Sequence, residues 1–275
     1  MKRSLVIGLF LVLAAACTTE SLPRDPERLV VEGWIDSDAA PVVMVTSPVA
    51  ATDIPQEVSS LADHLYYRAI VTVRDDTDGT EVTLTGRKDS RYLPPFIYTT
   101  ESLKGVAGHS YTLKVMYGNR LAQATARIPA PVPLDGVDVT RSEQSDTMYV
   151  VTARFQDPEG YHRFFTMVEG SDTMYLPSVL SGQKEANRVG AVSVMRGWSL
   201  TNLRRMPLYR KGEVVHLKFC SVEEEIWRYW DGFDKVSTLN TNGFFPASFN
   251  IPTNMKGAYG YWAGYGATYA TVTIE

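Results

Sequence analysis

The first half of the chain alternates apolar and polar residues with a period of two, the pattern of half-buried β-strands. It does so over residues 29–35, 69–74 and 111–117, and residues 42–46 form a short apolar run. No helical periodicity separates these segments. Several short strands joined by turns predict an immunoglobulin-like β-sandwich over residues 28–130.

Two dipeptides mark the turns between these strands. Asp78 with Gly79, and Gly118 with Asn119, provide residues that tolerate the positive φ angles of tight hairpins. The sandwich is expected to end in the proline-rich stretch 128–134 (IPAPVPL). Because proline cannot donate a hydrogen bond to a sheet, this stretch is interpreted as a semi-rigid boundary between two domains.

The second predicted domain, residues 131–275, is also β-rich. Alternating segments at 148–156, 163–169 and 215–219 predict strands, and the glycine- and aromatic-rich segment 257–275 predicts one or two closing strands. The fold class that follows is mainly β: a sandwich, then a second β-rich domain that carries one amphipathic helix.

That helix is predicted near residues 221–239. Its apolar residues recur at spacings of three and four, which places them on one face: Val222, Ile226, Tyr229, Trp230, Phe233, Val236 and Leu239. Ser221 followed by Glu224 has the spacing of a capping box, which would start the helix at the serine.

The N-terminus has the layout of a secretory signal peptide over residues 1–16. Lys2 and Arg3 precede an apolar run of about 12 residues, which is shorter than the roughly 20 that a membrane-spanning helix needs. Three alanines then precede Cys17, as in a lipobox, although the usual leucine is displaced by one position to Leu13. We expect cleavage before Cys17 and lipidation of its thiol. Plain secretion is the alternative interpretation.

Lipidation would make the membrane contact independent of any amphipathic helix, because two or more acyl chains suffice for stable anchoring. The polar residues 17–27, with Pro23 and Pro26, are then a lipidated tether. The expected location is the outer membrane, with the protein facing either the periplasm or the cell surface.

Composition narrows the functional classes. Without Lys2 and Arg3, 25 basic residues remain against 31 acidic ones, a net charge of about −6, and no basic patch suggests nucleic-acid binding. If Cys17 carries lipid, Cys220 has no partner for a disulfide within the chain. We interpret Cys220 as a buried core residue, with a reactive thiol as the alternative.

No motif in the sequence nominates an enzyme. The four histidines are scattered without metal-site spacing, and no cofactor or metal is expected. Residues 75–79 (DDTDG) superficially resemble a calcium loop. Counted from Gly79, however, the first and twelfth ligand positions hold Arg74 and Thr85, so a hairpin turn is favoured. The nucleophile-elbow and phosphate-loop patterns are absent from the sequence.

The least ordinary feature is the segment 258–269 (AYGYWAGYGATY), in which aromatic residues alternate with glycines. Aromatic faces can stack on a sugar or peptide, so a candidate ligand-binding set is Tyr259, Tyr261, Trp262 and Tyr265. The alternative is that these rings pack across neighbouring strands into the second core, with the glycines at bulges.

Several segments together resemble an uncharacterised family of large lipoproteins from Bacteroidota-type bacteria, which is assigned only a domain of unknown function. The resemblance covers nearly the whole chain after Cys17, and it rests on the late helix with Trp227 and Tyr229 and on short motifs. These motifs are Val30–Ile35 (VVEGWI), Ile128–Pro131 (IPAP), Phe244–Pro246 (FFP), Ile251–Asn254 (IPTN) and Gly257–Tyr261 (GAYGY).

The resemblance implies a functional context and carries over no catalytic or ligand residues. Genes of that family typically lie beside genes for TonB-dependent outer-membrane receptors, which implies a non-catalytic accessory of nutrient uptake with such a receptor as partner. The alternatives from the sequence are a surface adhesin or structural sandwich module, and a hydrolase with dispersed acidic residues.

Overall fold

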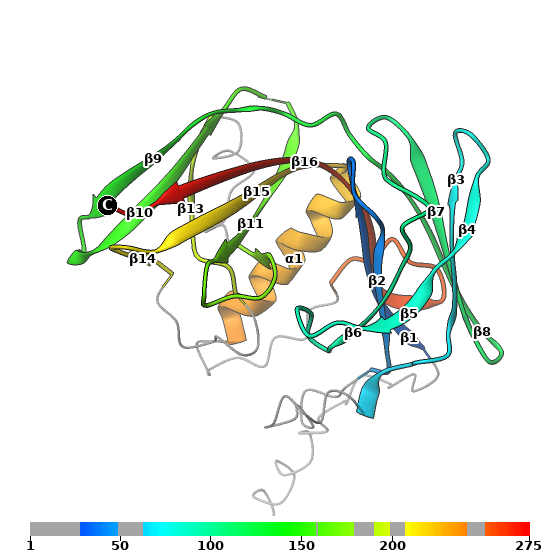
Figure 1. Ribbon diagram of the computed structural model, residues 1–275. Helices are drawn as coiled ribbons and strands as arrows, with labels where there is room; N and C mark the ends of the chain where they lie inside the picture. The colour runs from blue at the N-terminus through cyan, green and yellow to red at the C-terminus, as the bar shows by residue number, and fades with distance from the viewer. Residues whose placement is uncertain (1–27, 49–62, 158, 179–189, 199–206, 241–250) are drawn as a thin grey trace, which may run out of the picture.

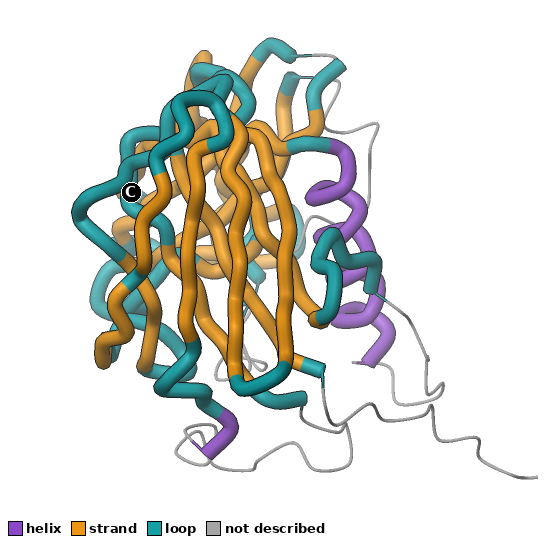
Figure 2. The backbone as a smooth tube through the Cα atoms, turned by 90° about the vertical axis from the view of Figure 1, so that its right-hand side faces the viewer, coloured by secondary structure: helices purple, strands orange, loops and turns teal. Residues whose placement is uncertain are grey.

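The computed structural model of the protein describes residues 28–48, 63–157, 159–178, 190–198, 207–240 and 251–275. These residues form a mainly β structure with three sheets and one α-helix (Figures 1 and 2). The prediction of a mainly β chain with one amphipathic helix is therefore confirmed. The predicted signal peptide and Cys17 lie outside the described residues.

The largest sheet has eight strands. In spatial order they are β12 (Leu176–Pro177), β11 (Tyr161–Val168), β15 (Val214–Val222), β16 (Ala258–Thr273), β1 (Leu29–Asp36), β2 (Val42–Thr46), β6 (Phe96–Thr99) and β5 (Thr85–Lys88). Every described strand of this sheet lies antiparallel to its neighbour except β16 and β1, which are parallel.

The two smaller sheets each have four strands. One has the order β4 (Glu81–Thr83), β3 (Ile70–Asp75), β7 (Ser110–Tyr117), β8 (Arg120–Arg127). In the other, β10 (Ser145–Phe155) pairs with β9 (Leu134–Ser142), β13 (Ala191–Val194) and β14 (Tyr209–Arg210).

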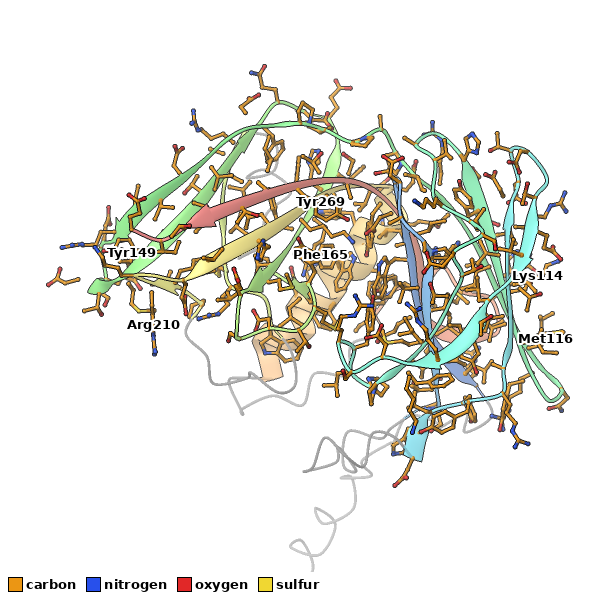
Figure 3. The ribbon with its side chains drawn as sticks, viewed as in Figure 1. Lys114, Met116, Tyr149, Phe165, Arg210 and Tyr269 are labelled. Carbon is orange, nitrogen blue, oxygen red and sulfur yellow. The ribbon has the colours of Figure 1, made fainter. Side chains whose placement is uncertain are left out.

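The alternation read from the sequence places residues on opposite faces as expected. On β7, Leu113 and Val115 are fully buried, whereas Lys114 and Met116 point away from the molecule (Figure 3). Both predicted hairpins are present, with Gly79 and Gly118 at φ angles of 83° and 61°. Strands β5, β6, β9, β12, β13 and β14 were not predicted.

Strand β16 belongs to both halves of the molecule. Residues 258–265 pair with β1 in parallel, and residues 266–273 pair with β15 in the antiparallel sense. In Figure 1 this strand, in red, crosses from β1 to the opposite half of the structure. One sheet therefore runs through the segments predicted as separate domains, because the last described strand joins the first.

Two cores lie against the outer face of this long sheet. The first fills the space between strands β16, β1, β2 and β6 and the sheet containing β3 and β7. Its fully buried members include Leu29, Val31, Ile35, Val43, Val71, Val73, Leu113, Val115, Ile128 and Trp262. The second lies between β11, β15 and the end of β16 and the sheet containing β10. Its members include Val151, Ala153, Phe155, Phe164, Val215, Leu217, Phe219 and Ile274. Burying each large apolar side chain contributes about 1.5–3 kcal/mol.

Trp262 connects β16 to the first core. Its indole lies over Gly33 of β1, where an added Cβ would come within 2.9 Å of the ring, and its Nε1 donates a hydrogen bond of 2.8 Å to the Tyr111 carbonyl. The Tyr111 hydroxyl in turn accepts a hydrogen bond of 2.9 Å from the Val106 backbone amide. The indole N–H and the phenol oxygen thus both have partners although their rings are fully buried.

The proline-rich stretch crosses the outer face of β16 between the two cores. A Cβ at Gly264 would lie 2.3 Å from the Arg127 carbonyl oxygen, and one at Gly266 would lie 2.4 Å from the Pro129 carbonyl oxygen. Beyond the crossing, Thr268 Oγ1 donates a hydrogen bond of 2.8 Å to the Val132 carbonyl. These two glycines are therefore required for backbone contact, which explains their alternation with aromatic residues.

Helix α1 (Glu224–Asn240) begins three residues later than the predicted Ser221 start. Ser221 is instead the penultimate residue of β15, where it pairs with His162 of β11 and Gly266 of β16. Because strand pairing continues through Val222, the capping-box interpretation is wrong. The Glu223 carbonyl accepts the first helical hydrogen bonds, from the amides of Ile226 and Trp227.

Gly264→Ala tests the crossing. The added methyl would overlap the Arg127 carbonyl oxygen, so the linker and β16 must separate, and we expect the free energy of unfolding to fall by about 3 kcal/mol or more. Urea unfolding measures this loss. The control is Thr273→Val on an exposed position of the same strand, which should change stability by less than about 0.5 kcal/mol. Equal stability of the two variants would contradict the crossing.

Candidate functional site

The inner face of the eight-stranded sheet bounds a cavity of about 1190 Å³. The outer face of this sheet packs on the two cores, whereas on the inner side the sheet bends around α1 (Figure 1). Strands from β11 to β6 contribute residues to its floor, α1 forms one wall, and residues 87–94 and 173–177 contribute to the rim.

The lining is rich in aromatic rings. Those that contribute to the cavity are Trp34, Tyr92, Phe165, Tyr175, Trp198, Tyr229, Trp230, Phe233, Tyr259, Tyr261 and Tyr265. Many contact one another: the ring centroids of Tyr229 and Tyr261 are 4.6 Å apart, and those of Trp230 and Tyr261 are 5.3 Å apart. Such tilted and edge-to-face contacts are favourable arrangements, so the wall and floor support each other.

A buried ion pair lies between β1 and β15 on the inner face. Lys218 Nζ is 2.7 Å from the carboxylate of Asp36, and Tyr269 donates a hydrogen bond of 3.1 Å to the same carboxylate. Phe165 and Tyr269, near the centre of Figure 3, belong to this cluster. Burial opposes the charge on Lys218, but the charged groups around it, Asp36 foremost, together raise the pKa of the lysine. The lysine therefore stays charged, and its contact with Asp36 ties β1 to β15.

A second ion pair fixes the helical wall. Arg163 of β11 donates two hydrogen bonds, of 2.6 and 2.9 Å, to Asp234 of α1. Its guanidinium carbon lies 4.7 Å from the centre of the Trp230 ring. Bidentate pairing and the stacked ring define both the distance and the rotation of the helix relative to the sheet.

Glu32 differs from the other charged residues of the cavity. It lies on β1 with its Cα opposite Tyr261 and Met44, and its side chain is partly exposed to the cavity. Burial raises the pKa of the Glu32 carboxyl. Among the described residues, none forms an ion pair or a side-chain hydrogen bond with this carboxyl.

The aromatic residues that the sequence nominated divide between two faces of β16. Tyr261 and Tyr265 are 6% and 1% exposed and line the cavity together with Tyr259, which is 39% exposed. Trp262 faces the other way and is part of the first core. The sequence had suggested either that Trp262 binds a ligand or that it packs into the second core, and the structure shows neither. Cys17 lies outside the described residues.

The sequence did not single out Glu32, Asp36, Lys218 or Arg163. One feature of the sequence did point to Glu32. On the face of β1 that alternation marks as polar, Val30 and Trp34 lie on either side of Glu32. A strand with apolar residues on both faces is covered on both sides. The lysine, the arginine and their partners were not recognisable, because each pair joins residues more than 70 positions apart.

Other chemical groups in the described part of the chain do not form a reactive cluster. All four histidines contact a polar side chain: His64 contacts Ser47, His109 contacts Asp75, His162 contacts Asp157, and His216 contacts Thr271 and Glu169. No group of three or more metal-ligating residues is found in the described part of the chain. Cys220 is fully buried as predicted, and burial raises the pKa of its thiol. No helix in this part is long and apolar enough to span a bilayer.

Glu32→Gln tests the electrostatic state of the cavity. The folded-state pKa of Glu32 is raised above its unfolded value, so its contribution to stability is fully present below the unfolded pKa of about 4.3 and is lost as pH rises through the folded pKa. Urea unfolding should therefore show Glu32→Gln gaining stability over the wild type as pH increases above the unfolded pKa of about 4.3. The control Glu101→Gln removes an exposed carboxyl at the cavity and should show no such pH-dependent gain. A constant difference between Glu32→Gln and wild type would refute the assignment.

Comparison with known proteins places the chain in a family. A search of curated proteins found no match. The profile of a family described as a domain of unknown function, DUF4249, matches residues 17–270. That match covers nearly the whole chain, including the β1 and β16 segments whose motifs carried the resemblance. The protein therefore belongs to the DUF4249 family, a domain of unknown function.

Proposed function

We propose that the protein is a non-catalytic, lipid-anchored outer-membrane protein that binds a small organic ligand, as an accessory to a TonB-dependent receptor. The observation that carries this proposal is the cavity of about 1190 Å³ on the inner face of the long sheet. A large concave site with mostly apolar walls, many of them aromatic, and some polar groups is the usual form of a small-molecule site.

The way the cavity is held open supports binding over catalysis. Asp36 is paired with Lys218, and Arg163 is paired with Asp234, so these four charged residues position the walls. Residues held in ion pairs of this kind are not available as an acid, a base or a nucleophile. Rigid walls reduce the entropy lost on binding, because fewer side chains must be ordered by the ligand.

The lipid anchor on Cys17 rests on the signal peptide and lipobox in the sequence. The tether of residues 17–27 would span at most roughly 38 Å when extended, which is enough to let the folded part reach a neighbouring receptor. The receptor as partner rests on the family resemblance described for the sequence.

We also propose that the first half is immunoglobulin-like. The strand orders β1-β2-β6-β5 and β4-β3-β7-β8 correspond to the orders A-B-E-D and C′-C-F-G of that fold. Tyr111, near the start of the strand in position F, accepts a hydrogen bond from the backbone five residues earlier, as in a tyrosine corner. Strand β16 adds to this arrangement beside β1.

Ligand binding is tested with N-phenyl-1-naphthylamine, a neutral fluorescent probe of apolar sites. Saturable binding of one probe per chain is expected. Thr46 lines the cavity from β2, so Thr46→Trp should weaken binding about tenfold by filling the space. The matched control Thr46→Val keeps the volume and should bind like the wild type. Binding that Thr46→Trp leaves unchanged would place the probe elsewhere and count against the cavity.

The anchor and the partner are tested together in cells that produce the full chain. Growth with an alkyne analogue of palmitate should label the wild-type protein and leave Cys17→Ser unlabelled. Purification of the wild type from detergent-solubilised outer membranes should recover a TonB-dependent barrel.

Two results would contradict these proposals separately. Labelling that persists in Cys17→Ser would exclude this cysteine as the lipid site. Recovery of the labelled protein without any barrel, from cells of the native host grown under inducing conditions, would exclude the receptor as a stable partner and favour an adhesin.

A further inference from the structure

We propose that Glu32 and the aromatic rings around it form a subsite for a positively charged organic ammonium group. This inference rests on the proposed function, because it assigns the charge of the ligand that the cavity takes. It specifies a ligand with two parts: an aromatic or apolar body that contacts the walls and a cationic nitrogen that lies at Glu32.

The neighbours of Glu32 suit a cation. Tyr261 lies beside it in register on β16, and Trp34 follows two residues later on the same face of β1. Tyr229 of α1 packs against Tyr261 with ring centroids 4.6 Å apart. Burial is the main cause that raises the pKa of both tyrosines, and the negative charge of Glu32 adds to the effect.

Aromatic faces attract cations because their π electrons concentrate negative potential above the ring, and this attraction strengthens where water is excluded. A carboxylate within such a group of rings adds a full negative charge. Together they form the arrangement by which proteins bind ammonium groups.

Glu32 is also the charged group on the described floor of the cavity that remains to be balanced. Asp36 is paired with Lys218, and Arg91 is paired with Asp89 at 2.6 Å. Arg87, which also acts on Asp89, lies on β5, three strand spacings or about 14 Å from β1. A ligand cation would therefore meet an unpaired carboxylate on the floor and no competing described cation beside it.

The absence of a partner has an energetic cost in the free protein. A carboxylate taken out of water without a compensating donor or cation destabilises the fold, and the raised pKa of Glu32 reports that cost. A bound ammonium group removes the cost, so the charge that weakens the empty protein strengthens the complex. A ligand with only hydroxyl groups would gain much less binding free energy at Glu32.

The experiment compares three probes with one ring system and different charge. They are naphthalen-2-ylmethylammonium, naphthalen-2-ylmethanol and naphthalene-2-carboxylate, titrated calorimetrically into protein purified from cells that express the full chain, at about pH 7.5, where the amine is protonated. The ammonium probe should bind about tenfold more tightly than the alcohol, and the carboxylate should bind most weakly.

Variants assign this preference to Glu32. Glu32→Gln keeps the shape and hydrogen-bonding capacity but removes the charge, so it should lower affinity for the ammonium probe about tenfold and change affinity for the alcohol by less than about twofold. Glu101→Gln removes a carboxyl elsewhere on the cavity lining and should leave all three affinities unchanged. Thermal unfolding verifies that each variant is folded.

The outcomes separate this inference from the proposed function. Equal binding of the ammonium and alcohol probes, lost in both cases with Thr46→Trp, would overturn the cationic subsite and leave ligand binding in the cavity standing. Tighter binding of the carboxylate would also overturn the subsite. Failure of all three probes to bind would overturn both the subsite and the proposed cavity function.

Discussion

The pairing of β16 with both β1 and β15 is the constraint on which the rest of the structure depends. It joins two sheets into one and sets the outer faces of both halves against their cores. It also creates the uninterrupted inner face on which the cavity forms. Trp262 anchors one half of this strand in the first core, and Ala270 and Val272 pack the other half against the second. The glycines between them admit the linker, so the sequence of one strand encodes three different contacts.

The cavity combines charge with an aromatic surface in an unusual distribution. Buried ions destabilise a fold unless they are paired, and removing one partner of a buried pair costs about 3–5 kcal/mol. The chain satisfies this requirement at Lys218 and Arg163, each of which is paired with an acid and lies near aromatic rings. It does not satisfy it at Glu32. The paired charges that hold the structure together are thus separate from Glu32, the unpaired carboxyl on the described floor of the cavity. Such a separation is typical of sites where stability is given up for binding.

Local features of the fold were predictable from the sequence, whereas its long-range pairings were not. Strand β1, both hairpins and the apolar stripe of α1 follow from periodicity within a few residues. The start of α1 was misplaced because Ser221 and Glu224 satisfy a local capping rule, while pairing with two distant strands keeps Ser221 extended. The parallel pairing of residues 29–36 with 258–265 leaves no local signature. For the same reason Tyr261 and Tyr265 were identified as candidate ligand residues, but Glu32 was not placed beside them.

The position of β16 in the chain affects the order in which the long sheet can assemble. Residues 258–273 follow every other described strand in the chain. Strands β1 and β15 are therefore synthesised before β16, the strand that pairs with both of them. Until then each presents an unpaired edge, and such edges associate readily with other chains. The floor of the cavity is completed only by this last strand. A chain interrupted before it would lack Tyr259, Tyr261, Tyr265 and the strand that joins β1 to β15. The complete site therefore forms only after synthesis has reached this strand.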